Sequence, residues 1–194
     1  MALFSCCNCD PTAEEEIQTQ LQPCDDEVHE GSEDMPMTAE QKQKEKERLQ
    51  ALVKSFAKAA VGGAACSFLD LTTQRQIPGR YFLDKTLTNF RLVFSESVQH
   101  SFPLKALHEV YSHSALLENK ATASLAKEPG LQSLESSVTD SLVMLEYVDS
   151  GGSHLNRLFL LEQGGPDGRD RFITCMKVLG LYAKSGSTQN ASSS

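Results

Sequence analysis

Three cysteines near the N-terminus are the residues of this sequence with the clearest chemical potential. Cys6, Cys7 and Cys9 lie within four positions of one another and follow the apolar residues Leu3 and Phe4. Thiols placed in this way can accept acyl chains by S-acylation, and each methylene buried in a bilayer contributes about 0.8 kcal/mol of membrane affinity. One acyl chain anchors a protein marginally, whereas two or three anchor it stably. The pattern therefore predicts lipid attachment at these thiols.

Two other interpretations of the same thiols stay open. Zinc sites usually take cysteines in C-x(2–4)-C pairs, whereas these three are closer together and the nearest histidine is His29. The thiols could also belong to an unmodified N-terminal segment. We predict neither a metal site nor another cofactor.

The other three cysteines lie in different surroundings. Cys24 stands alone in an acidic stretch, whereas Cys66 and Cys175 lie in apolar segments and are expected in the core. No apolar run approaches the ~20 residues that span a bilayer, and the first residues do not form a signal peptide. We therefore expect reduced thiols and no disulfide framework.

Charge divides the chain into two parts. The sequence has 194 residues with 26 acidic and 18 basic side chains, and residues 1–37 hold ten of the acidic residues and none of the basic ones. Residues 10–37 have few large apolar side chains, so we predict a disordered acidic spacer there. The nearly neutral remainder has no broad positive field, which argues against nucleic acid as a partner.

The first element after this spacer is a helix over residues 38–61. Thr38 and Gln41 form the T-x-x-Q capping-box pattern, and the Gly62-Gly63 pair ends the helix. Basic side chains in its first turns favour either simple solvation or a weak attraction to anionic lipid. Apolar residues follow at helical spacing: Leu49, Leu52, Val53, Phe56 and Ala60.

Short apolar segments with alternating polar residues follow and predict seven antiparallel strands. Pro78-Gly79 and residues 149–153 supply turn chemistry between strands. Residues 113–140 lack strand periodicity and form an insertion, which is either disordered or contains a short helix around Leu116 or Leu134. The predicted strands are residues 64–71, 79–85, 89–95, 99–104, 107–112, 142–148 and 155–162.

A second amphipathic helix closes the predicted domain. Asp167 can cap it, and its apolar stripe needs a sheet to cover. We therefore predict a mainly β, α+β fold: a pleckstrin-homology-like, seven-stranded antiparallel barrel or sandwich capped by a C-terminal helix, with an additional N-terminal helix. The stripe consists of Phe172, Met176, Leu179 and Ala183.

The predicted domain organisation has four parts. Residues 1–37 form the disordered tail with the acylation cysteines, and residues 38–61 form the first helix. Residues 62–184 form the pleckstrin-homology-like domain, and residues 185–194 form a second disordered tail.

The predicted core offers no catalytic constellation, so we do not expect an enzyme. No carboxylate pair or nucleophile lies at a recognisable offset, and no histidine has metal-ligand spacing. Pleckstrin-homology folds commonly bind phosphoinositides through basic residues of the first two strands, and here that loop offers only Arg75 and Arg80. Two arginines form a poor cage for a phosphorylated ring, so they are either exposed loop residues or weak phosphoinositide contacts.

Three segments together resemble a known family. They are S-C-C at residues 5–7, G-R-Y-F-L-D-K-T-L-T-N-F-R-L at 79–92 and F-P-L-K-A-L-H-E-V-Y-S at 102–112. With the acidic spacer, they resemble the inner membrane complex sub-compartment proteins of apicomplexan parasites and their relatives. The resemblance implies a small pleckstrin-homology-like protein at the cell cortex, or pellicle. It would lie on the cytoplasmic face of the flattened sacs beneath the plasma membrane. The resemblance also implies a part in cortical cytoskeleton and daughter-cell assembly, with a fold that favours protein partners over phosphoinositides.

One position departs from the family pattern. Members begin Met-Gly, and the glycine amine accepts myristate, whereas residue 2 here is Ala. The lipid sites that carry over are therefore Cys6 and Cys7, with Cys9 added on its chemistry. We predict a non-catalytic scaffold held at a membrane by acyl chains and binding protein partners not identified by the sequence; the alternative is a soluble phosphoinositide-binding adaptor.

Overall fold

The computed structural model describes residues 38–94, 99–149, 152 and 154–189. It begins with helix α1, Ala39–Gly62, whose N-terminus carries the predicted capping box. The Thr38 hydroxyl accepts a hydrogen bond from the Gln41 amide at 3.2 Å, and the Gln41 side chain accepts one from the Thr38 amide at 2.8 Å. The helix ends at Gly63, whose φ of 88° favours glycine.

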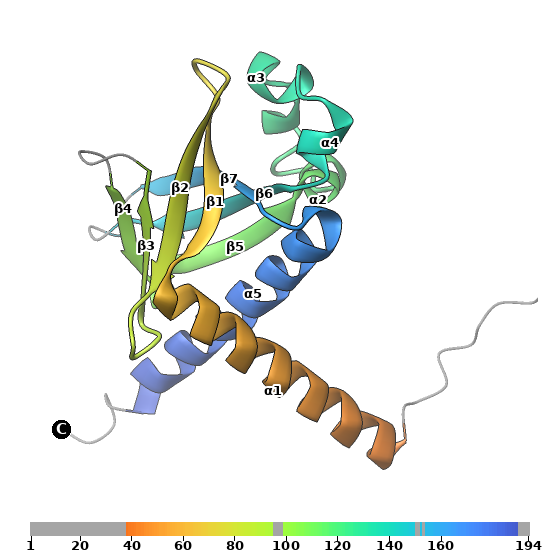
Figure 1. Ribbon diagram of the computed structural model, residues 1–194, viewed down its shortest axis with the longest axis vertical. Coiled ribbons are helices and arrows are strands. Elements are labelled where there is room, and N and C mark those ends of the chain that lie inside the picture. Colours follow the sequence, from red (N-terminus) through yellow and green to blue (C-terminus); the bar gives the residue numbers. More distant parts are fainter. Residues whose placement is uncertain (1–37, 95–98, 150–151, 153, 190–194) are drawn as a thin grey trace, which may run out of the picture. The chain divides into compact units, whose positions relative to one another are not determined.

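Seven antiparallel strands form one sheet in the order β4-β3-β2-β1-β7-β6-β5. This arrangement, with helix α5 (Gly165–Gln189) against it, is the predicted α+β architecture and is consistent with a pleckstrin-homology-like fold (Figure 1). The strands are β1 Ala64–Asp70, β2 Arg75–Leu83, β3 Asn89–Val93, β4 Gln99–Pro103, β5 Leu107–Ser112, β6 Leu142–Val148 and β7 Leu155–Glu162.

The sheet does not close into the barrel that the sequence suggested. Among the strands described, β4 and β5 are the two edges, and the 3-10 turn η1 (Leu104–Ala106) joins them at a corner. Side chains fill the space that a ladder would occupy, because Phe102 of β4 stacks on Tyr147 of β6 with ring centroids 4.1 Å apart. Packing across this corner replaces backbone pairing.

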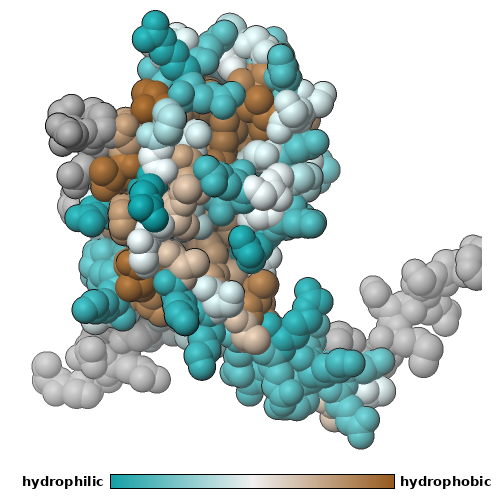
Figure 2. All heavy atoms as spheres, viewed as in Figure 1, coloured by the Kyte–Doolittle hydropathy of each residue, from teal (hydrophilic) through white to brown (hydrophobic). Residues whose placement is uncertain are grey.

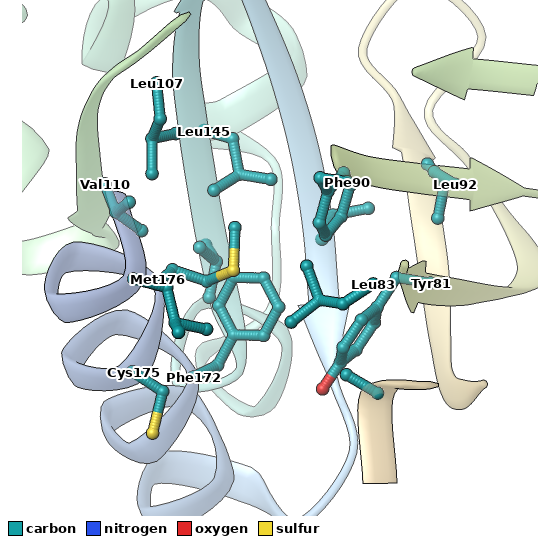
Figure 3. Packing of buried hydrophobic residues seen from close by; sticks show 14 of the residues in the cluster. Tyr81, Leu83, Phe90, Leu92, Leu107, Val110, Leu145, Phe172, Cys175 and Met176 are labelled. Atoms are coloured by element: carbon teal, nitrogen blue, oxygen red, sulfur yellow. The ribbon is translucent and has the colours of Figure 1, made fainter. Parts of the chain in front are cut away.

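One face of the sheet packs against α5 and α1, and we call the apolar cluster there the inner core. Phe172 of α5 lies edge-on to Tyr81 at 5.1 Å and to Phe56 of α1 at 5.8 Å. The predicted stripe of α5 therefore does cover the sheet, and Figure 3 shows its side chains directed at those of the strands. The inner core includes Phe56, Tyr81, Leu83, Phe90, Leu92, Leu107, Val110, Leu145, Phe172, Cys175 and Met176.

The insertion at residues 113–140 covers the other face. It folds into α2 (His113–Glu118), η2 (Leu125–Lys127), α3 (Pro129–Gln132) and α4 (Ser136–Thr139). Strand β6 is consequently buried on both faces along its first five residues. We call this second cluster the outer cluster; its buried members are Leu69, Leu116, Leu131, Leu142, Met144, Phe159 and Leu161.

Several predicted boundaries differ from the structure. Pro78 and Gly79 were predicted as a turn, but both lie inside β2, and the turn falls at residues 71–74, where Gln74 has a φ of 55°. Proline is tolerated because β2 pairs with β3 only from Arg80 onward, so at Pro78 no ladder bond to β3 is lost.

The helical ends differ in a similar way. Asp167 does not cap α5 but lies in its first turn, since the Gly168 amide donates to the Gly164 carbonyl. Glycine suits that start because Gly164 has a φ of 101°. At its other end α5 continues to Gln189, past residue 184, where we placed the end of the domain. In the insertion, Leu116 lies in a short helix, whereas Leu134 lies between α3 and α4.

Candidate functional site

The six cysteines separate into those outside and those inside the described structure. The predicted acylation sites Cys6, Cys7 and Cys9 lie outside the described residues. Cys66 and Cys175 are free thiols in the inner core, 1% and 0% exposed. Burial raises the pKa of Cys66 to about 12 and that of Cys175 to about 11, so neither supplies thiolate near neutral pH. These two thiols are structural.

Arg80, one of the two candidate headgroup contacts, has a partner inside the protein. Its guanidinium donates to the Gly63 carbonyl from Nε at 3.1 Å and from Nη2 at 2.6 Å. Cationic donors at a helix C-terminus satisfy backbone carbonyls that lack an intrahelical partner. Arg80 therefore fastens the end of α1 to β2.

Arg75, the other candidate, does not share a site with Arg80. The two residues are five positions apart in an unbroken strand, so their side chains leave opposite faces and their Cα atoms are separated by roughly 16 Å. Arg75 also pairs in the ladder with Asp70, a carboxylate. The structure does not bring the two guanidinium groups together around one phosphorylated ring.

The turn between β1 and β2 is organised by that carboxylate. Asp70 accepts hydrogen bonds from the Thr73 hydroxyl at 2.7 Å and from the Thr72 amide at 2.9 Å. These bonds lower the pKa of Asp70, which keeps it negative near neutral pH. A fixed negative charge beside Arg75 weakens the attraction of this loop for anions.

A buried carboxyl group borders the inner core, and no pattern in the sequence predicted it. Glu162 at the end of β7 is 8% exposed and accepts a hydrogen bond from the Tyr81 hydroxyl at 3.2 Å. Its second oxygen, Oε2, is buried without a hydrogen-bond partner. Burial raises the pKa of Glu162 to about 7, although Tyr81 and Arg171 oppose the shift. The only signal in the sequence was a charged residue ending the apolar run L-F-L-L-E.

A second buried carboxylate, Glu146, has partners for both oxygens. Arg157 Nε lies 3.1 Å from Oε1, and His108 Nδ1 lies 3.2 Å from Oε2. Within the described residues, no group of three or more His, Cys, Asp or Glu side chains could hold a metal ion. Through Arg157 and His108, Glu146 joins β5, β6 and β7.

The described surface also has an apolar hollow of about 370 Å³ between α1 and α5. The two helices approach each other beside the sheet and diverge away from it (Figure 1). The sequence did not predict this groove, because the apolar stripe of each helix does not show how the two helices cross. Its lining residues are Lys46, Leu49, Gln50, Val53, Lys54, Ala57, Leu87, Val178 and Tyr182.

The groove has an apolar floor and a basic margin. Leu49, Val53 and Ala57 follow one another at i, i+4 spacing, so they form one stripe of α1. Lys46 and Lys54, which are exposed, lie on the neighbouring row, and the lining contains no carboxylate. Toward its N-terminus, α1 is exposed over residues 39–48, and Figure 2 shows this projecting half of α1 as mainly hydrophilic. Such a surface can bind an apolar group that carries negative charge beside it.

No described helix is long and apolar enough to cross a bilayer.

Comparisons with known proteins gave similarities only among solved structures. No family model matches the chain, and no curated protein sequence matches it. Inner membrane complex sub-compartment protein 1 of Toxoplasma gondii is 14% identical, with a TM-score of 0.49 over 78% of this chain and 99% of that one. Sub-compartment protein 3 of the same organism is 9% identical, with a TM-score of 0.43 over 70% of this chain and 87% of that one.

A structure of a different kind is similar to the same degree. L. pealei PLC21 is 9% identical, with a TM-score of 0.45 over 62% of this chain and 15% of that one. Identities this low do not carry function from any of these proteins to this chain.

Proposed function

We propose that this chain is a non-catalytic scaffold protein of a membrane surface. In this proposal, acyl chains on Cys6, Cys7 and Cys9 attach the protein to the bilayer, and the pleckstrin-homology-like domain binds protein partners. The observation that carries the proposal is the contrast among the cysteines. Cys66 and Cys175 are buried with raised pKa values, whereas the three clustered thiols lie outside the described residues and follow Leu3 and Phe4 in the sequence.

The membrane that we propose is the inner membrane complex, with the protein on its cytoplasmic face. The support is the sequence resemblance, above all residues 79–92 and 102–112, which fall in the β2–β3 and β4–β5 regions of the sheet. In this setting the partners would be proteins of the cortical cytoskeleton that assembles in daughter cells.

Protein partners, rather than phosphoinositides, are proposed because of the positions of the two arginines. Arg80 is hydrogen-bonded to Gly63, and Arg75 lies on the opposite face of β2 beside Asp70. A phosphorylated inositol ring needs several donors fixed around it. Flotation of the unacylated chain with phosphoinositide vesicles, with and without Arg75→Ala, tests this point; binding that depends on Arg75 would favour the adaptor function instead.

Replacing the three thiols tests the membrane attachment. The variant Cys6→Ser, Cys7→Ser, Cys9→Ser should move the protein from the membrane pellet to the supernatant, because each acyl chain contributes about 0.8 kcal/mol per buried methylene. Single substitutions should release less protein, since two chains still anchor stably. The measurement is fractionation of cells together with acyl-exchange labelling of each cysteine.

The isolated thiol Cys24 supplies the matched control. Cys24→Ser removes a thiol from the acidic spacer that follows the cluster and should leave the distribution unchanged. Circular dichroism should give the same spectrum for the triple variant and the wild type. Continued pelleting of the triple variant, or native membrane-bound protein with unmodified thiols, would refute the proposal.

A further inference from the structure

The groove between α1 and α5 combines an apolar hollow with bordering charges of one sign. It holds about 370 Å³, and its lining includes Leu49, Val53 and Val178 but no acidic residue. Tyr182 forms part of the α5 wall and is 68% exposed, so a large ring faces solvent there. Solvent-exposed apolar surface next to fixed charge is typical of a recognition site.

Basic residues continue along α1 beyond the hollow itself. Lys42, Lys46, Gln50 and Lys54 follow at i, i+4 spacing and form one row next to the apolar floor. All four are exposed. A ligand lying along the groove therefore meets apolar side chains below it and ammonium groups along one side.

The walls of the groove determine the backbone conformation that fits it. Both walls are helices, and the amides and carbonyls inside a helix bond to one another. An extended peptide would find no backbone partners there, unlike a strand added to a sheet edge. A helix satisfies its own backbone and can place side chains at i, i+3, i+4 and i+7 into the hollow. The part of α1 that lines the groove, from Lys46 to Ala57, is roughly 18 Å long and can hold about three turns of a partner helix.

We infer that the groove between α1 and α5 binds an amphipathic helix of a partner protein, with an apolar face seated on Leu49 and Val53 and carboxylates along Lys46 and Lys54. This inference rests on the proposed scaffold function, because it identifies the kind of partner that the domain binds. Charge complementarity sets the specificity: acidic residues on the partner pair with the lysine row, and basic residues are repelled. A flat bilayer fits less well, because the apolar floor lies in a hollow.

The absence of tryptophan from the chain permits a direct binding measurement. The probes are synthetic helical peptides of about 18 residues, or about 27 Å, each with a leucine face and a single tryptophan. Three versions carry Glu, Gln or Lys along one edge of that face. Purified full chain without acyl groups is titrated into each peptide, and tryptophan fluorescence reports binding. The acidic peptide should bind saturably and most tightly, and the basic peptide least.

Charge reversal on α1 provides the decisive variants. Lys46→Glu with Lys54→Glu should weaken binding of the acidic peptide roughly tenfold and strengthen binding of the basic one. Lys44→Glu with Arg48→Glu makes the same charge change on the opposite side of the same helix, outside the groove lining, and should change little. Tyr182→Ser, at an exposed position, removes the ring from the α5 wall without adding charge and should weaken binding of all three peptides. Circular dichroism of each variant verifies that the fold is retained.

Several outcomes would overturn the inference. They are the absence of saturable binding, equal binding of the three peptides, and binding that the Lys46/Lys54 pair does not alter. If that pair instead abolished flotation with anionic vesicles, or self-association in sedimentation, without peptide binding, the groove would serve a lipid surface or a second copy of the chain. All arms use unacylated protein, so a negative result here is independent of the cysteine experiment.

Discussion

The two faces of the sheet are closed by different means. On the inner face, two long helices cover a core rich in rings, with Phe56 on α1 and Phe172 on α5. On the outer face, four short helical segments of the insertion cover an almost entirely aliphatic cluster around Leu116 and Leu142. Hydrophobic periodicity in the sequence predicts long helices, whereas helical segments of three to six residues are too short to show it.

The faces also differ in how they bury polar groups. The outer side satisfies its polar atoms: the Thr122 hydroxyl donates to the Leu116 carbonyl at 3.1 Å, and Arg157 and His108 contact the two oxygens of Glu146. The inner core leaves Glu162 Oε2 without a hydrogen bond. Among the described residues, the larger and more aromatic core therefore contains a buried polar atom without a hydrogen bond, and the smaller cluster does not.

A truncation in the inner core should lower the stability of the protein more than any other change proposed below. Phe172→Ala should lower the free energy of unfolding by about 3–5 kcal/mol, because it removes the ring between Tyr81 and Phe56 and leaves a cavity. Chemical denaturation monitored by circular dichroism measures the change. A midpoint equal to that of the wild type would contradict the packing of α5 on the sheet.

The buried carboxyl group of Glu162 should make the stability of the protein depend on pH. Glu162 has a pKa of about 7 when folded against an ordinary value of 4.5, so the folded state holds the proton more tightly. Its contribution is most favourable below about pH 4.5, falls as the pH rises to about 7, and is constant above. The total change is about 3 kcal/mol at most.

Glu162→Gln is the control that isolates this carboxyl group from all others. The difference in unfolding free energy between wild type and variant, measured from pH 4 to pH 8, should follow that window. A difference that does not vary with pH would show that Glu162 is ionised in the same range in the folded and unfolded chain.

The outer cluster should respond less to truncation than the inner core. Leu116→Ala should cost roughly 2–3 kcal/mol, at the lower end for a buried leucine, because short helices can shift to fill the space. Urea denaturation should show a smaller loss than for Phe172→Ala. The opposite ranking would mean that the outer cluster, rather than the inner core, dominates stability.

Substitution of two glycines, one packed against the turn after β1 and one in open space, tests how closely the insertion packs, with the smallest change in stability of the four predictions. A Cβ at Gly130 would lie 2.6 Å from the Leu71 carbonyl oxygen, so Gly130→Ala should displace α3 and cost about 1–2 kcal/mol. Gly62→Ala is the matched control, because its Cβ would meet nothing within 4 Å. Thermal unfolding should separate the two variants, and equal melting temperatures would argue against close packing of the insertion.

Sequence reasoning worked where one pattern determined one element. Strands β5, β6 and β7 were predicted with the observed bounds, because apolar runs there end at turn residues. The stripe that includes Phe172 and Met176 identified α5 and the face that it buries. The capping box at Thr38 placed the start of α1 correctly.

Sequence reasoning failed where the outcome depended on contacts between distant segments. Pro78 has the appearance of a turn residue, and only its unpaired side toward β3 explains its place inside β2. The continuous apolar run of β6 is explained by the insertion on its second face, which no local pattern showed. The groove and the burial of Glu162 likewise require the crossing of α1 and α5 and the position of β7.

The hydrogen bonds from Arg80 to the Gly63 carbonyl affect the entropy that the protein loses when a ligand binds. Arg80 holds the end of α1 from the outer side of β2, while Phe56 holds the same helix from the inner side. Because α1 is held at these two points, it has little freedom to rotate relative to the sheet. The width of the groove between α1 and α5 is therefore set before a ligand binds. A preorganised recess loses little conformational entropy on association, and this favours tight and selective capture.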